Sequence, residues 1–218
     1  MRSAVRIVTG TVASLAITVG SVSTASADSG TVEDKRNDVV YQGKVGGDRT
    51  SSQKSFANRT DVTRVKISHG SKNVSVKLTF ADLRSADGKA LRVEIAKKSI
   101  TNRTGRVTPF FELEGTITEP RGIVNVYSLG DKEVCGTELD TDGDGPYTAE
   151  SYIKTSVTTG KNGYYKMQVP RSCLDNESKI KVRVTVSGST SSTRGAFLDY
   201  VSPSKFKTPA WSEWILKD

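Results

Sequence analysis

The densest group of potential metal ligands in the chain is the acidic segment Asp140-Thr141-Asp142-Gly143-Asp144-Gly145. Carboxylates at positions 1, 3 and 5 followed by glycine at position 6 match the first half of a calcium-binding loop. The second half departs from that pattern, because Ser151 stands at position 12, where an EF-hand carries a bidentate glutamate. The segment therefore predicts either a structural calcium site formed by Asp140, Asp142 and Asp144 or a solvated acidic turn.

Cys135 and Cys173 are the only cysteines of the chain. An exported protein meets an oxidising environment, where an even number of cysteines usually pairs, and the spacing is not the C-x-x-C of a redox site. We therefore expect a structural disulfide between Cys135 and Cys173. Closing a loop of about 38 residues contributes roughly 3–4 kcal/mol on a chain-entropy estimate.

Catalytic chemistry has few candidate residues. The single histidine, His69, alternates in phase with Val65 and Ile67, so we expect it on a buried strand face or at a strand end. The chain contains no G-x-S-x-G, H-E-x-x-H, P-loop or G-x-G-x-x-G strand-to-helix unit. Two carboxylates distant in sequence can still meet and form a glycosidase site, but no pair is singled out. The sequence predicts no catalytic residues and a protein that is not an enzyme.

Trp211 and Trp214 are the only tryptophans and lie close to the end of the chain. Exposed tryptophans form platforms for sugar rings, whereas large aromatic side chains are mostly buried. We expect the pair to close a sheet or one end of the core, with a binding platform as the alternative.

The segment 1–27 has the features of an export signal. Arg2 and Arg6 precede an apolar stretch interrupted by threonine, serine and glycine, and Ala25-Ser26-Ala27 supplies a cleavage site. We expect cleavage after Ala27, a secreted product and no transmembrane segment in the mature form. Loss of the two arginines lowers the formal net charge from +8 to 8 − 2 = +6.

Positive charge is densest between Arg84 and Arg106. On a strand, Arg92 and Glu94 would share one outward face, so part of this charge neutralises itself. We expect a solvated sheet face there, with a polyanion site as the alternative, and no specific nucleic-acid partner.

The pattern of apolar residues sets the elements that must position these groups. Apolar residues occupy every second position at Val74–Phe80 and at Ile180–Val186, which is the period of a half-buried strand. The segments Gly70-Ser71-Lys72 and Asn162-Gly163 predict turns between strands. Further strand-like runs are Val65–His69, Leu91–Ile95, Phe111–Leu113, Ile123–Tyr127, Tyr152–Val157 and Tyr164–Val169. About seven to nine strands with no long amphipathic helix predict an all-β, two-sheet antiparallel sandwich of jelly-roll or immunoglobulin-like type.

We expect one domain over 61–218, in the usual size range of a single domain. The preceding segment, 28–60, is polar and charged and predicts a partly flexible mature N-terminus. Its one short apolar run, Val39-Val40-Tyr41, is available as an edge strand. The composition, with 35% hydrophobic residues, 19 glycines and 2 cysteines, excludes collagen-like and cysteine-dense classes.

Several segments carry a resemblance to a known group of proteins. These are the export signal, Thr60–His69, Val169-Pro170-Arg171-Ser172-Cys173-Leu174, Ile180–Val186, the region of Asp199 and Trp211-Ser212-Glu213-Trp214-Ile215. They resemble exported β-sandwich proteins of actinobacteria that carry a V-P-R-x-C-L element and have no assigned function. More remotely, the alternation resembles DOMON-like domains and family 9 carbohydrate-binding modules. The resemblance implies fold and location more than activity.

These observations together predict a secreted, non-catalytic β-sandwich protein that binds a glycan, a wall polymer or a protein at the cell surface. One alternative is a structural or interaction protein with no small ligand, and another is a hydrolase that uses two distant carboxylates. Calcium, in a structural role, is the one expected cofactor. The sequence does not identify the ligand-binding residues.

Overall fold

The computed structural model describes residues 28–41, 44–45, 50–84, 89–97, 109–117, 123–128, 132–137, 151–189, 196–203 and 208–217. The predicted export signal and the predicted calcium ligands Asp140, Asp142 and Asp144 lie outside the described residues. Within these ranges, no helix has the length and apolar character needed to span a membrane.

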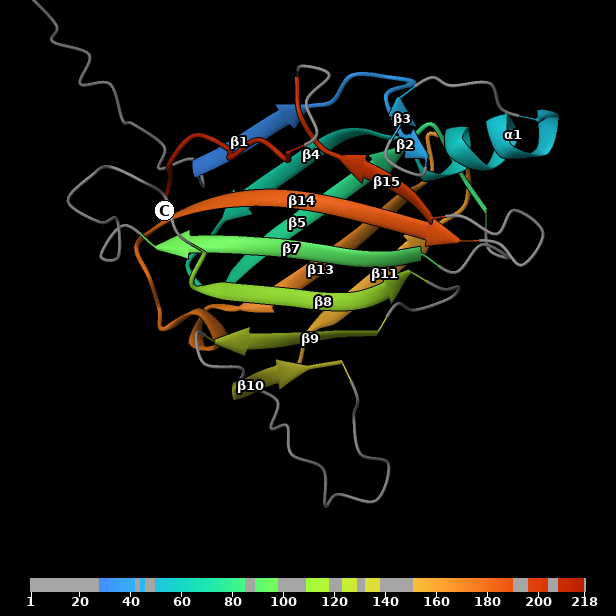
Figure 1. Cartoon of the computed structure of the whole chain (residues 1–218). Helices are drawn as coiled ribbons and strands as arrows, with labels where there is room; N and C mark the ends of the chain where they lie inside the picture. Colours follow the sequence, from blue (N-terminus) through green and yellow to red (C-terminus); the bar gives the residue numbers. More distant parts are fainter. Residues whose placement is uncertain are drawn as a thin grey trace, which may run out of the picture.

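Two antiparallel sheets stack face to face and form a β-sandwich (Figure 1). The five-stranded sheet has the order β1 (Asp28–Glu33), β4 (Val62–His69), β5 (Asn73–Phe80), β13 (Tyr164–Pro170) and β11 (Lys154–Thr158). The nine-stranded sheet has the order β10 (Lys132–Gly136), β9 (Ile123–Ser128), β8 (Phe111–Ile117), β7 (Lys89–Lys97), β14 (Lys179–Ser189), β15 (Ala196–Tyr200), β2 (Val40–Tyr41) and β3 (Lys44–Val45), and β16 (Ile215–Leu216) also pairs with β14. A small sheet pairs β12 (Gly160–Lys161) with β6 (Asp82–Leu83). The predicted all-β, two-sheet sandwich is confirmed.

The core lies between the sheets, because the long strands turn their apolar positions inward. In β5 these are Val74, Val76, Leu78 and Phe80, each with 0% of its surface exposed. In β14 they are Ile180, Val182, Val184 and Val186, each at most 2% exposed. Fully burying a Val, Leu, Ile or Phe side chain contributes roughly 1.5–3 kcal/mol, so this alternation supplies the main force that joins the sheets.

The predicted turns lie where the sequence placed them. β4 and β5 pair antiparallel, and Gly70 N donates to Asn73 O at 3.0 Å to close their turn. Between β12 and β13, Asn162 has φ = 56°, a left-handed conformation that asparagine tolerates better than most residues. Gly163 N then donates to Gly160 O at 2.9 Å.

The segment 28–60 contains more regular structure than the single edge strand expected from its sequence. β1 pairs with β4, β2 pairs with β15, and α1 (Ser51–Thr60) is a ten-residue helix. Thr50 caps the helix through a capping box with Gln53, which satisfies free backbone N–H groups of the first turn. Phe56 of the helix packs on Phe197 of β15 with ring centroids 4.9 Å apart. Tertiary packing of one aromatic side chain therefore anchors a helix whose own sequence is mostly polar.

Cys135 and Cys173 form the predicted disulfide. Cys135 is on β10 at one edge of the nine-stranded sheet, and Cys173 is in the short 3₁₀ helix η2 (Arg171–Leu174) that follows β13 of the other sheet. Both cysteines are 3% exposed. The bond therefore joins the two sheets at the β10 edge.

The segment 208–217 runs beside β14. Ser212 N donates to Val182 O at 2.8 Å, and Val182 N donates to Ser212 Oγ at 3.0 Å. β16 then pairs with the beginning of β14 through Ile180 and Ile215. The segment thus fills the edge of β14 that β15 leaves open.

Candidate ligand-binding face

The solvent side of the nine-stranded sheet carries rows of polar side chains from β15, β14, β7, β8 and β9, which we call the outer face. Paired residues of neighbouring strands project to the same side of a sheet, so the strand register defines each row. One row contains Tyr200, Thr185, Arg92, Glu114 and Asn125. The next row contains Arg183, Glu94, Glu112 and Tyr127.

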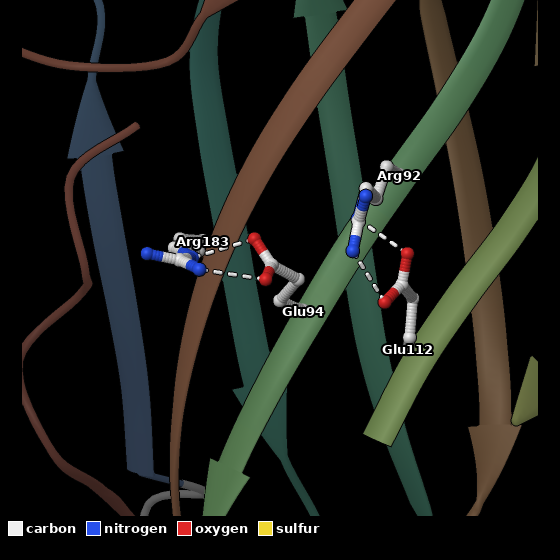
Figure 2. A network of polar contacts seen from close by, with 4 residues as sticks. All are labelled: Arg92, Glu94, Glu112 and Arg183. Carbon is white, nitrogen blue, oxygen red and sulfur yellow. Dashed lines mark hydrogen bonds and ion pairs between the residues drawn. The ribbon is translucent and has the colours of Figure 1, made fainter. Parts of the chain in front are cut away.

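Two arginine–glutamate pairs lie on the outer face (Figure 2). Arg183 Nε and Nη2 donate to Glu94 Oε2 and Oε1 at 2.5 and 2.6 Å. Arg92 Nη2 donates to Glu112 Oε2 at 2.6 Å, and its Nε also pairs with Glu112 Oε1. Glu94 and Glu112 are directly opposite each other in the register, where like charges repel. The two guanidinium groups neutralise this repulsion, and Arg183 binds both oxygens of Glu94 in bidentate geometry.

On the outer face, Glu112 has a raised pKa. Burial raises the pKa of Glu112, and the neighbouring Glu114 carboxyl raises it further, while Arg92 acts in the opposite direction. The net direction is upward.

The outer face is hollowed over a volume of about 920 Å³. This hollow has the size of a typical binding site, but it lies over several strands. Its lining includes the polar residues Arg92, Glu94, Glu114, Thr116, Asn125, Arg183, Thr185, Ser187 and Thr208 and the less polar residues Ala90, Leu91, Gly115, Leu198, Tyr200 and Pro209. The hollow therefore offers many hydrogen-bonding groups and a few apolar contacts near β15.

Trp211 and Trp214 pack against the outside of the sheet and are half-buried. The Arg183 guanidinium carbon lies 4.5 Å from the centroid of the Trp211 ring, and Lys181 Nζ lies 5.3 Å from that of Trp214. The pair thus packs on a sheet, but it covers cations of β14 and does not enter the core. Trp211 reaches the outer face through the same arginine that binds Glu94.

The charged stretch that begins at Arg84 is largely paired where the structure describes it. Arg84 pairs with Asp82, and Arg92 pairs with Glu112. Lys97 Nζ lies 2.7 Å from Asp175 Oδ2 and 3.7 Å from Glu177 Oε1. Arg92 and Glu94 share the outer face, as expected, although the partner of Glu94 is Arg183. Pairing of these charges favours a solvated face over a polyanion site.

His69 is the last residue of β4 and is 1% exposed, which agrees with the expected buried strand end. Its Nδ1 lies 3.3 Å from Ile215 O of β16. The histidine therefore contacts the segment that closes the sheet and lies on the core side, away from the outer face.

A second group of acids lies inside the sandwich and was not identified from the sequence. One carboxylate oxygen each of Asp34, Asp38 and Asp199 lies within 4.8 Å of the other two, and Asp61 is an electrostatic neighbour. Burial raises the pKa of Asp34 to about 8 and that of Asp61 to about 6, and it raises the pKa of Asp199 as well. The other aspartates of the group act in the same direction.

The sequence did contain one signal for this group. Asp199 lies on β15 between the buried residues Phe197 and Val201, two positions from each. The alternating pattern of the strand predicts an apolar residue at this inward-facing position. A buried polar residue in an apolar phase is more informative than an exposed one.

Comparison of the chain with protein-family models, with curated proteins and with solved structures finds no match. The resemblance to exported actinobacterial proteins, to DOMON-like domains and to family 9 carbohydrate-binding modules stays a prediction.

Proposed function

We propose that this chain is an exported, non-catalytic binding protein that holds a neutral glycan or wall polymer on the outer face. The observation that supports this most directly is the hollow of about 920 Å³ above the nine-stranded sheet. Because its lining comes from β7, β8, β9, β14 and β15, an extended polymer can contact more of it than a compact molecule.

The side chains of the hollow suit the chemistry of sugars. Sugar hydroxyls both donate and accept hydrogen bonds, and the hollow offers guanidinium donors in Arg92 and Arg183, carboxylate acceptors in Glu94 and Glu114, and the amide of Asn125. Tyr200 supplies an aromatic surface for the apolar face of a sugar ring. Polar side chains that are already held in place lose little conformational entropy when a ligand binds.

The balance of charge favours a neutral ligand over a polyanion. Each arginine of the two central pairs is neutralised by a glutamate, and Glu114 adds a further acid to the lining. A polyanion would have to displace these carboxylates from their guanidinium partners.

Export is supported by two independent features. The sequence begins with a predicted signal segment, and a disulfide joins Cys135 to Cys173. Structural disulfides are typical of oxidising compartments outside the cytosol.

The binding proposal is tested by pull-down of the purified protein on insoluble cellulose, chitin and peptidoglycan, and by a soluble glycan array. We expect retention on at least one neutral polymer. Replacing Tyr200 with Ala should weaken binding about tenfold, because loss of a stacked aromatic costs roughly 1.4 kcal/mol.

Tyr164→Ala is the matched control. Tyr164 is also half-buried and on a strand surface, but it belongs to β13 of the five-stranded sheet, where Lys77 Nζ lies 3.9 Å from its ring centroid. This variant should bind as the wild type does. Equal loss in both variants, or no retention on any polymer, would count against the proposal and favour a structural or interaction protein with no small ligand.

A hydrolase is the second candidate, because Glu94, Glu112 and Glu114 share the outer face and Glu112 has a raised pKa. A glycosidase needs one protonated and one ionised carboxyl beside the scissile bond. The guanidinium partners of Glu94 and Glu112 favour fixed hydrogen-bonding roles instead. Release of reducing ends from a bound polymer, abolished by Glu114→Gln, would replace the binding proposal with hydrolysis.

A further inference from the structure

The three buried aspartates Asp38, Asp61 and Asp199 and the half-buried Asp34 come from segments that meet only in the folded protein. Asp34 follows β1 of the five-stranded sheet, and Asp38 precedes β2 of the nine-stranded sheet. Asp61 lies between α1 and β4, and Asp199 is on β15. The group therefore lies where the two sheets approach each other at the β1 and β2 edges (Figure 1).

Asp199 is the most informative member. Its residue surface is 0% exposed, and its Oδ2 accepts a hydrogen bond from Val62 N at 2.5 Å. Its Oδ1 is also buried but accepts no hydrogen bond from the described residues. A buried carboxylate oxygen without a donor is costly, because water no longer solvates it.

Asp34 shows the same division of roles. Its Oδ1 accepts from Ser202 N at 2.7 Å, whereas its Oδ2 is buried and accepts no hydrogen bond from the described residues. Asp61 accepts from Asn37 N with both oxygens at 3.2 Å. Backbone N–H groups thus orient these carboxylates while leaving an oxygen of Asp34 and one of Asp199 without a donor.

Arg36 is a positive electrostatic neighbour of Asp61 and lowers its pKa. In the part of the chain that the structure describes, no lysine or arginine forms an ion pair with Asp34, Asp61 or Asp199. Burying several carboxylates together requires a counter-charge or protonation. A cation supplies that charge and also satisfies the oxygens that lack donors.

We propose that Asp34, Asp38 and Asp199 bind a calcium ion, with Asp61 as an outer acid that adds negative charge to the site. Oxygens that coordinate one calcium at 2.3–2.6 Å lie at most about 5 Å apart, whereas those around magnesium at 2.0–2.1 Å lie at most about 4 Å apart. The three oxygens lie within 4.8 Å of one another, which is within the reach of one calcium. Carboxylates from separate segments also suit its flexible coordination, since magnesium demands near-ideal octahedral geometry.

A polar hollow of about 290 Å³ lies beside the site at Asp34. Asp34 itself lines this hollow, together with Glu33, Arg36, Thr63, Arg64, Thr79 and Asn162. The ion would tie the segment between β1 and β2 to β15. It would thus join the two sheets at the edge opposite the disulfide.

Thermal unfolding and calorimetric titration of the full chain test the proposal, with calcium alone as the probe. The wild type should take up one calcium at this site. Its Tm in 10 mM calcium should lie roughly 5–10 °C above its Tm in EDTA, if the dissociation constant is near 10⁻⁴ M. Magnesium at the same concentration should give a smaller shift.

Asp199→Asn preserves the shape of the side chain and an oxygen for Val62 N, but removes the charge. In this variant the calcium-dependent shift should disappear, while the Tm in EDTA should equal or exceed that of the wild type because repulsion is relieved. Asp38→Asn is a second variant in case the first fails to fold, and it should also lose the shift.

Two control variants distinguish this site from other acids. Asp142→Ala removes a ligand of the predicted acidic segment, and Asp175→Asn removes an exposed carboxylate whose side chain is 57% exposed. Both should keep the shift that Asp199→Asn loses. The proposal is overturned if calcium and EDTA give the same wild-type Tm, or if Asp199→Asn keeps a shift that Asp142→Ala loses. None of these measurements uses a polysaccharide, so their outcome is independent of the binding proposal.

Discussion

Glu94 and Arg183 face each other across β7 and β14 on a surface that is only partly open to water. Their side chains are 9% and 24% exposed, whereas those of Glu33 and Arg64, which form an ion pair on the five-stranded sheet, are 59% and 58% exposed. Exposed ion pairs contribute little because water and salt screen them. A shielded, bidentate pair is different, since removing one partner leaves the other charge poorly solvated.

We predict that Glu94→Gln destabilises the protein by roughly 2–4 kcal/mol, because Arg183 then keeps its charge without a carboxylate partner. Urea unfolding of the two single variants and of the double variant Glu94→Gln/Arg183→Met measures the interaction. The double variant should lose less than the sum of the single variants.

Glu33→Gln provides the exposed comparison and should cost less than about 1 kcal/mol. Additive losses at Glu94 and Arg183, or equal losses at Glu94 and Glu33, would show that the outer-face pair is no stronger than an exposed one.

At the scale of single residues, the sequence predicted the disulfide and the position of His69, but it did not predict the ion pair of the outer face or the group of aspartates. Cys135 and Cys173 could be paired because they are the only cysteines, and His69 could be placed because it continues an alternating strand. The Arg183–Glu94 pair could not be predicted, since 89 residues separate its members and only the register of β7 and β14 joins them. The sequence did not single out Asp34 or Asp38, because both lie in a polar segment, where acidic residues are expected to be exposed.

At the scale of elements, the position of α1 depends on its close packing against β14 at Gly188. A Cβ atom at Gly188 of β14 would lie 2.9 Å from Phe56 Cε1, 3.0 Å from Phe56 Cζ and 3.2 Å from Thr60 Oγ1. Glycine therefore lets the helix lie directly on the strand. The same ring packs on Phe197 and is 1% exposed, so it has little room to move away.

We predict that Gly188→Ala lowers the free energy of unfolding by about 1–3 kcal/mol, because overpacking displaces Phe56 and with it α1. Gly70→Ala is the matched control, since its added Cβ would meet only Asn73 O at 3.6 Å, an ordinary contact. It should change stability by less than about 0.5 kcal/mol.

Urea unfolding gives the free energies, and hydrogen exchange of the α1 amides shows whether the helix has loosened. A second substitution, Phe56→Leu, should recover part of the loss in Gly188→Ala. If both glycine variants unfold alike, the close packing of Phe56 on β14 is not limiting.

The strands and the helix differ in how well they could be predicted from the sequence. Long strands such as β5 and β14 alternate strictly and were predicted to within a few residues. α1 was missed because its mostly polar sequence has no clear apolar stripe, although the capping box Thr50–Gln53 was a usable signal. The segment 208–217 was also not predicted to run along β14, because its main contacts use backbone groups and a serine hydroxyl.

At the scale of the whole molecule, the sandwich is joined across its two sheets near opposite edges. The disulfide ties β10 to the segment after β13, and the buried aspartates lie near β1, β2 and β15. The order of strands that creates these edges could not be predicted, since alternation shows which face of a strand is buried but not which strand lies beside it. β14, for example, pairs with β7, which lies far from it in the chain.

We predict that removal of the disulfide in Cys135→Ala/Cys173→Ala costs roughly 3–4 kcal/mol, because the unfolded chain gains the freedom of an open 38-residue loop. For a protein of this size the Tm should fall by roughly 6–14 °C, and reduction of the wild type should give a similar fall. Chelation of calcium at the proposed site would perturb the opposite edge, so its effect on the free energy of unfolding should add to that of the disulfide within about 0.5 kcal/mol. Strong non-additivity would mean that the two edges do not act separately. An unchanged Tm in the double-alanine variant would show that packing of η2 against β10 suffices without the bond.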